Sequence, residues 1–465
     1  MTEVQTAPVP RRNLELLLLV LALCVGGAAF FLVGSTTEGV DNTDFYVQMS
    51  IMAVLALSVH VLLRIFAKYA DPVILPITVA LNSLGLAMIH RIDLAKGTSQ
   101  SARQLLWTAI AIVIAAAVLW AVKDHRILRR FTYIALLASI VLLLLPLIPH
   151  LGVTINGARI WIRIGAFSLQ PGEIAKITLS IFFAGYLSSN RDLILLAGHK
   201  FGPLQLPRLR DMAPMVIAWL LSIGVLVVQR DLGSAILFFG LFIVMVYVAT
   251  ARISWVLIGL LMVVAGGFVA GLTMSHVTRR LDVWLNAFDP AIYQAAGGSM
   301  QIVEGLFGMA DGGLFGTGLG AGSPYRVPLA NSDMIIASFG EEIGLIGLTA
   351  IVLLYMLLVS RGLRAALGSR DSFGKLLAAG LSFTLGLQCV VIIGGVTRLI
   401  PLTGLATPFM AAGGSSLLAN WIIIALLLLI SHNSRRPKSG VSGPTDEIAT
   451  PSKAPTTSTK VVKSK

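Results

Sequence analysis

The chain has 465 residues, of which 56% are hydrophobic and only 12% are charged, and its mean hydropathy is +0.86. Soluble domains of this size carry about 25% charged residues, so the composition excludes a soluble protein. It predicts an all-α, polytopic integral membrane protein. The formal net charge of +13 would suit a nucleic-acid-binding protein, unless the basic residues prove to be distributed as in membrane proteins.

Twelve apolar segments are candidates for crossing a hydrocarbon layer about 30 Å thick. No small-residue cleavage site follows the first segment, so we expect it to remain as a membrane anchor. Cys24 and Cys389 lie within apolar segments and are expected to be packing residues, not a disulfide or a metal pair. The expected crossings are residues 14–34, 47–66, 73–92, 104–122, 131–149, 173–188, 213–229, 232–250, 253–274, 334–359, 375–397 and 405–430.

The distribution of Lys and Arg sets the expected orientation. If the N-terminus is cytoplasmic, most of the 35 Lys and Arg residues fall on cytoplasmic segments, as the positive-inside rule requires. The basic charge then faces anionic lipid, and we expect no nucleic-acid partner. Both termini are predicted to be cytoplasmic, and the long loops 150–172 and 275–333 extracytoplasmic. The tail from Ser431 is rich in Ser, Thr, Pro and Lys and is expected to be disordered.

Residues 311–344, DGGLFGTGLGAGSPYRVPLANSDMIIASFGEEIG, combine a glycine-rich loop with a lone acid. Gly316, Gly318 and Gly320 permit positive φ and a close backbone approach, so they are predicted to form a mobile loop or hinge. The loop lacks the Gly-Lys-Ser/Thr ending of a nucleotide-binding P-loop. Asp333 precedes an apolar helix that is predicted to begin near Met334, where an acid is costly to desolvate. It is therefore a candidate functional residue.

A second group of polar residues lies at the ends of predicted helices. Glu173 and Lys176 share one helix face and are expected to pair, with Pro171 at the helix start. The pair is either an interfacial salt bridge or a charged patch in a substrate cavity. Asp231, in the sequence Gln229-Arg230-Asp231, is expected to cap the next helix in a tight outer turn.

The other polar candidates belong to the outer loops or the next helix. Trp161 and Arg163 are either interface anchors or a platform for a sugar or pyrophosphate. The cations Arg326 and Arg398 are either solvated or phosphate-binding. Asp282 and Asp289 are expected to be solvated or to cap helices. Gly340 and Gly344 form a GxxxG that permits another helix to approach closely.

The histidines His60, His150 and His276 are scattered. They show neither the spacing of metal ligands nor a nucleophile partner.

Four segments, in order, are similar to motifs of the SEDS family (shape, elongation, division and sporulation). They are ARIWIRIGAFSLQPGEIAK (158–176), QRDLGSA (229–235), GGLFGTGLGAG with NSDMIIASFGEEIGLIG (312–322 and 331–347), and LIPLTGLATPFMAAGGSS (399–416). The chain departs from the family pattern at Asn331 and Ser332 (usually His and Thr), Thr317 (usually Lys), Arg230 (usually Pro) and Ala411-Ala412 (usually Ser-Tyr).

The resemblance implies a peptidoglycan glycosyltransferase that polymerises lipid II on the outer face of the cytoplasmic membrane, together with a class B penicillin-binding protein. It implies a ten-helix core with two further N-terminal helices. We divide the chain into a cytoplasmic N-terminus (1–13), N-terminal helices (14–130), a catalytic core (131–432) and a cytoplasmic tail (433–465). The length and short tail favour a RodA-like elongation role over an FtsW-like division role.

The resemblance also implies roles for individual residues. Asp333 would be the catalytic general base. Residues that contact the substrate would be Glu173, Lys176, Trp161, Arg163, Gln170, Arg326 and Ser415. No protein metal ligands are expected, although a divalent cation could accompany the pyrophosphate. The alternatives are a flippase for the lipid-linked precursor and a non-catalytic scaffold for a penicillin-binding protein. The clustering of polar residues at the outer edge favours the enzyme.

Overall fold

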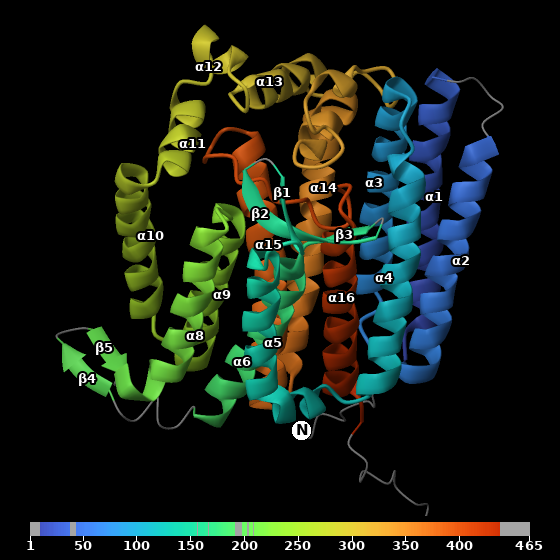
Figure 1. The fold of residues 1–465 in the computed structure, drawn as a ribbon. Coiled ribbons are helices and arrows are strands. Elements are labelled where there is room, and N and C mark those ends of the chain that lie inside the picture. The colour runs from blue at the N-terminus through green and yellow to red at the C-terminus, as the bar shows by residue number, and fades with distance from the viewer. Residues whose placement is uncertain are drawn as a thin grey trace, which may run out of the picture.

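A computed structural model describes residues 10–37, 43–155, 157–165, 167–190, 198–201, 204–207 and 209–437. Long helices run side by side in a bundle (Figure 1), which confirms the predicted all-α, polytopic membrane fold. The long helices are α1 (Arg12–Thr37), α2 (Thr43–Phe66), α3 (Ile74–Lys96), α4 (Gln100–Val122), α5 (Thr132–Leu144), α6 (Pro171–Ser189), α8 (Leu209–Val228), α9 (Leu232–Thr250), α10 (Ser254–Thr273), α14 (Ile335–Gly368), α15 (Ser372–Val396) and α16 (Gly414–Arg435).

A long helix occupies each predicted segment, and within the described residues ten helical stretches are long and apolar enough to cross a membrane. One of these combines the 3-10 helix η1 (His125–Phe131), α5 and the 3-10 turn η2 (Leu145–Leu147). The other two predicted positions hold α6, which carries two charges, and α8, whose apolar part is short. The count of twelve crossings therefore stays a prediction. In the interior, α3 and α16 are buried along most of their length, whereas α10 buries almost none of its side chains, as expected of a lipid-facing helix.

The two outer loops contain secondary structure that we did not predict. Three strands, β1 (Gly152–Ile155), β2 (Ala158–Ile164) and β3 (Phe167–Leu169), form an antiparallel sheet of order β1–β2–β3. Its β-branched residues favour strands. The second loop holds α11 (Ser275–Leu285), α12 (Pro290–Gln294), α13 (Met300–Gly312) and the turn η3 (Pro324–Arg326). A short hairpin, β4 (Gly198–Phe201) and β5 (Leu204–Pro207), lies at the opposite end of the bundle (Figure 1).

The predicted last crossing, 405–430, is wrong at both ends. Residues 401–413 are not helical, because Pro408 interrupts a helix and the backbone takes positive φ at Gly404 (75°) and Phe409 (65°). The helix α16 begins only at Gly414 and continues to Arg435. The predicted disordered tail therefore starts too early, since residues 431–435 are helical. Its remaining part, from residue 438, lies outside the described residues.

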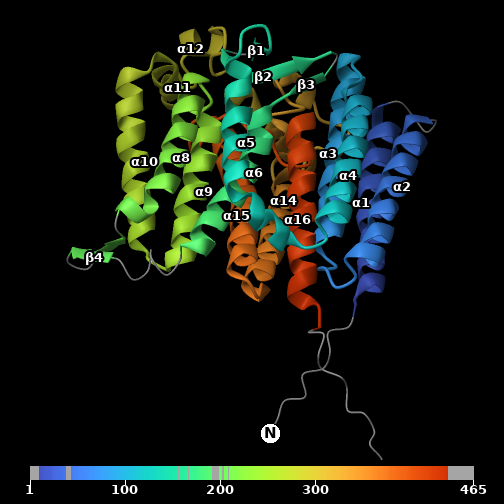
Figure 2. The same ribbon diagram turned by 60° about the horizontal axis from the view of Figure 1, so that its bottom comes forward.

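The first and last described helices meet at one end of the bundle, the lower end in Figures 1 and 2. Here Arg12 of α1 donates to the carbonyl of Ala70, and Arg435 of α16 pairs with Asp71. The described chain therefore begins and ends on the same side, as the predicted orientation requires.

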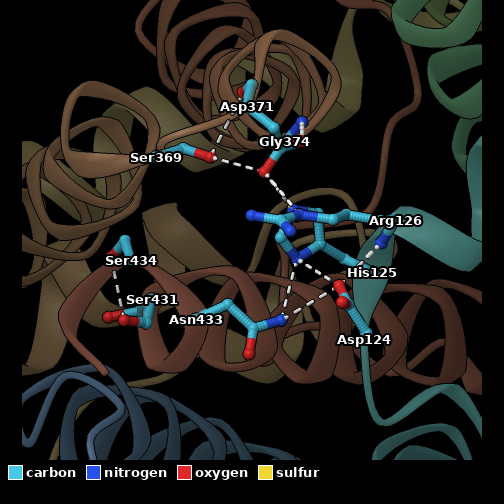
Figure 3. Close-up of polar contacts among 9 residues, drawn as sticks. All are labelled: Asp124, His125, Arg126, Ser369, Asp371, Gly374, Ser431, Asn433 and Ser434. Carbon is cyan, nitrogen blue, oxygen red and sulfur yellow. Dashed lines mark hydrogen bonds and ion pairs between the residues drawn. The ribbon is translucent and has the colours of Figure 1, made fainter. Parts of the chain in front are cut away.

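A polar junction at this end joins η1, α15 and α16 (Figure 3). His125 Nε2 donates to Asp371 Oδ1 at 3.0 Å, and Asn433 Nδ2 donates to His125 Nδ1 at 3.0 Å. Asp371 caps α15 by accepting from the Gly374 amide at 2.7 Å. Burial alone would raise the pKa of Asp371, but the hydrogen bonds from His125 and Gly374 hold this pKa below its usual value. The junction therefore favours a charged carboxylate.

Candidate active site around Asp333

Asp333 lies directly before α14, which begins at Ile335 with Met334 as its N-cap. The predicted helix start is thus confirmed to within one residue. Met334 and Ile335 are fully buried, but Asp333 keeps part of its surface exposed. The segment 401–413 covers the carboxylate, since a Cβ placed on Gly404 would lie 3.7 Å from Asp333 Oδ2. Asp333 is therefore an acid held among protein groups with one side open.

The charge on Asp333 is set by burial and by one cation. Burial raises the pKa of Asp333 to about 6, while the nearby positive charge of Arg280, on α11, acts in the opposite direction. Arg280 Nη1 donates to the carbonyls of Leu402 and Thr403, each at 3.1 Å. Arg280 therefore ties α11 to the segment that covers Asp333. Our sequence analysis did not single out this residue, although it lies in a predicted outer loop rich in charge.

Glu173 and Lys176 pair as predicted, with Lys176 Nζ donating to Glu173 Oε2 at 2.6 Å. Both side chains are about 5% exposed or less, so the pair lies inside the bundle and not at its surface. Lys176 also donates to Gln388 Oε1 at 3.1 Å, and Gln388 donates to the carbonyl of Ala406 at 2.8 Å. This chain of bonds connects α6 and α15 to the segment 401–413. Gln388 was missed because an amide within an apolar helix gives no motif.

Asp231 connects these two groups of charges. Its Oδ1 accepts from the Ser234 amide at 2.9 Å, which confirms the predicted cap of α9. Burial raises the pKa of Asp231; the negative charge of Glu173 adds to this effect, and the positive charge of Arg280 opposes it. Five ionisable side chains therefore come together from four elements: Glu173, Lys176, Asp231, Arg280 and Asp333.

The other residues predicted to contact the substrate lie on or next to the sheet, at the start of α16 and in η3. The Gln170 amide donates to Ser415 Oγ at 2.8 Å, which joins the end of the sheet to α16. Trp161, half-buried, and Arg163, exposed, project from the same face of β2, because side chains two apart along a strand share a face. Arg326 is exposed and hydrogen-bonds to Tyr325. Their predicted roles in substrate binding stay predictions.

Arg398 is bonded to carbonyls within the protein, and the two roles that we considered for it, solvation and phosphate binding, stay predictions. Its Nε donates to the carbonyl of Trp284 at 2.8 Å and its Nη2 to that of Leu285 at 2.7 Å. Its guanidinium also lies over the ring of Phe288, 5.1 Å from the centroid. Arg398 thus closes the C-terminal end of α11, where carbonyls lack helical partners. In the same region Asp289 caps α12, as predicted.

The glycine loop packs against the first turns of α14. Gly316, Gly318 and Gly320 all have positive φ, as predicted. The amide of Gly318 donates to the Glu342 carbonyl at 2.9 Å, and that of Gly320 to Glu342 Oε2 at 3.0 Å. The predicted hinge is therefore bonded to α14 in this conformation, and its motion stays a prediction.

The predicted GxxxG permits a close helix approach at Gly340, as expected, and its second glycine packs against the glycine loop. Gly344 has a φ of 65° and kinks α14 where the glycine loop crosses it, and Gly340 packs against Met309 of α13. The site thus depends on a break in α14 that the repeated glycine spacing did not reveal.

Among the described residues, no three His, Cys, Asp or Glu side chains are grouped closely enough to hold a metal ion. Asp231 and Asp333 both feel the positive charge of Arg280, and the third carboxylate of the cluster, Glu173, is paired with Lys176. A divalent cation that accompanies the pyrophosphate stays a prediction.

Comparisons with known proteins agree with the motifs. A family described as "Cell cycle protein", with FtsW, RodA and SpoVE as members, matches residues 72–436. The helices α1 and α2 precede this range. The chain is 49% identical over 446 residues to a peptidoglycan glycosyltransferase RodA from Mycobacterium tuberculosis, covering 93% of each chain. It is 33% identical over 377 residues to the stage V sporulation protein E of Bacillus subtilis, covering 78% of this chain and 98% of that one.

Solved structures share the fold. The crystal structure of the rod shape determining protein RodA of Thermus thermophilus matches with a TM-score of 0.54 and 26% identity, covering 78% of this chain and 96% of that one. A structure described as "Structural coordination of polymerization and crosslinking by a peptidoglycan synthase complex" matches with a TM-score of 0.62 and 24% identity, covering 78% and 98%.

Proposed function

Because the chain belongs to the FtsW, RodA and SpoVE family, we propose that it is a peptidoglycan glycosyltransferase that polymerises lipid II with Asp333 as its general base. The observation that carries the proposal is the environment of Asp333. This carboxylate is partly open, its pKa is raised to about 6 by burial, and a cation lies nearby. A base works best when its pKa lies close to the working pH, so Asp333 is both mostly ionised and basic enough at neutral pH.

In the proposed reaction, the Asp333 carboxylate takes the proton of the acceptor's 4-hydroxyl group. The hydroxyl oxygen then forms a bond to C1 of the donor sugar. The bond from C1 to the undecaprenyl pyrophosphate breaks, its electron pair leaves with the pyrophosphate, and the α configuration becomes β. General-base help of this kind is worth roughly 10²–10⁴-fold in rate.

Arg280 is the cation best placed to face the leaving pyrophosphate. It lies close to Asp333, and the hydrogen bonds from its Nη1 to the carbonyls of the segment 401–413 hold it there. Lys176 is occupied by Glu173 and Gln388 and is almost fully buried, so we assign it to positioning the segment 401–413. The mechanism assigns no step to a divalent cation.

The site would work outside the cytoplasm, with both termini cytoplasmic, since the basic residues then lie mostly inside. The likeness to a component of a peptidoglycan synthase complex supports a class B penicillin-binding protein as partner. Similarity to RodA proteins over 93% of the chain supports a role in cell elongation.

The test is polymer formation from purified lipid II by the full chain with its partner, comparing wild type, Asp333→Asn and Asp282→Asn. Asp282 is an exposed acid on α11 and serves as the matched control. We expect Asp333→Asn to lower the rate by at least ~10²-fold and Asp282→Asn to leave it unchanged, with both proteins binding the partner. Polymerisation by Asp333→Asn within a few-fold of wild type would remove Asp333 as the base. Lipid translocation in vesicles without any new glycosidic bond would instead favour a flippase.

A further inference from the structure

A cavity of about 350 Å³ lies at the end of the bundle away from Asp333. The helix α14 begins beside Asp333, and Arg361 of the cavity lies in its last two turns. The volume falls within the range of small-molecule pockets, about 300–1,000 Å³. The cavity is lined by Arg11, which directly precedes α1, Leu14 of α1, Tyr69, Ala70, Pro72 and Val73 of the segment before α3, Arg361 of α14 and Arg435 of α16.

The polar wall of this cavity carries more positive than negative charge. Two of its three arginines share the carboxylate of Asp71, which pairs with Arg435 and lies 3.8 Å from Arg361 Nη1, and the third, Arg11, forms no ion pair within the described residues. The Asp71 side chain is fully buried and also accepts from the Val73 amide at 2.9 Å. Arg12, the neighbour of Arg11, pairs with Glu15 and donates to the Ala70 carbonyl, so its charge is already matched by a carboxylate outside the cavity lining. The cavity therefore keeps an excess of positive charge.

Arg361 lines the cavity with a side chain that is 26% exposed. Its ion pair with Asp71, at 3.8 Å, is too long for a hydrogen bond, so an anionic oxygen in the cavity would be favoured. The guanidinium presents several N–H groups in a fixed plane, a geometry that suits phosphate oxygens.

The opposite wall of the cavity is apolar and continues along the outside of α1. Leu14 is 41% exposed, and Leu17 and Leu21, at 67% and 60%, lie on the same helix face. This face covers nothing in the described protein and would lie against lipid chains. A ligand that fits both walls has an anionic head and an acyl chain.

We propose that this cavity binds the phosphate head group of an anionic membrane phospholipid. Arg11, Arg361 and Arg435 donate to the phosphate oxygens, and one acyl chain follows Leu14, Leu17 and Leu21. Under the orientation proposed above, the lipid comes from the cytoplasmic leaflet, where basic pockets between helices recognise anionic head groups. Because α1 precedes the family match at residues 72–436, the lipid joins an added N-terminal helix to the family core at α14 and α16.

The test uses the purified full chain and native mass spectrometry, with phosphatidylglycerol and phosphatidylcholine as probes. The double variant Arg11→Gln/Arg361→Gln removes two lining charges and leaves the ion pair of Arg435 with Asp71 in place. The control double variant Arg130→Gln/Arg364→Gln removes two exposed arginines from the same end of the bundle. At about fivefold per arginine near an anionic lipid, we expect phosphatidylglycerol to bind roughly 30-fold more weakly to the first variant and unchanged to the control.

Two further variants keep the test independent of folding. Arg11→Gln alone changes an exposed side chain and should weaken binding about fivefold, whereas Arg361→Lys keeps the charge and should retain most of it. Equal binding of phosphatidylglycerol to both double variants, or equal binding of phosphatidylcholine to wild type, would overturn the proposal. Displacement of the lipid by millimolar inorganic phosphate would do the same, since it would assign the cavity to a soluble anion.

Discussion

The buried pair of Glu173 and Lys176 offers a direct test of how α6 supports the site. Lys176→Met removes the donor to Glu173 Oε2 and to Gln388 Oε1, and leaves a carboxylate only 5% exposed without a counter-ion. Breaking a buried ion pair on one side costs about 3–5 kcal/mol. We therefore expect Lys176→Met to lower the free energy of unfolding by that amount.

Removing the second charge should restore most of this loss. Replacing a whole buried ion pair with apolar residues of similar volume is often neutral, so Glu173→Leu/Lys176→Met should lie close to wild type. A residual loss of about 1 kcal/mol is expected, because Gln388 Oε1 is left without its donor. The free energy of unfolding would be measured by SDS titration in mixed micelles, with circular dichroism as the readout.

Arg364→Gln, a change at an exposed arginine of α14, is the matched control and should shift stability by no more than about 0.5 kcal/mol. The reasoning fails if Lys176→Met behaves like this control, or if the double variant is as unstable as the single one. Glycan synthesis by the double variant separates the two interpretations of the pair. A stable and active protein means that the pair positions the segment 401–413, and a stable but inactive one means that it contacts the substrate.

Two further predictions follow from the outer site. The Asp333 carboxylate must be ionised to accept a proton, and its pKa is about 6. We therefore expect kcat/KM to fall about tenfold per pH unit below pH ~6 and to stay level just above it. A level profile down to pH ~5 would exclude Asp333 as the base. Gly316→Ala should destabilise the protein by ~1–3 kcal/mol more than Gly313→Ala, since both positions have positive φ but only at Gly316 would the new Cβ overlap the Glu342 carbonyl. Equal thermal stability of these two variants would contradict that packing.

The sequence determined the features that depend on neighbouring residues. Long apolar stretches placed the helices, because a span must satisfy its own backbone within hydrocarbon. Asp231 as a cap, Glu173 with Lys176 as a pair, and the start of α14 next to Asp333 were also predictable. Each of these involves residues within one helical turn, where spacing alone fixes which groups meet.

Only the tertiary structure decided what surrounds Asp333. Pro408 interrupts a helix in the run 405–413, but the position of this segment beside Asp333 is fixed because Arg280, Gln388 and Asn331 bond to its backbone or to the residues just before it. Those partners come from three other parts of the chain. The cavity at Arg361 likewise forms only where α1, α14 and α16 converge. Local sequence cannot reveal such sites, because the bonds that create them join different elements, and these elements meet only through packing.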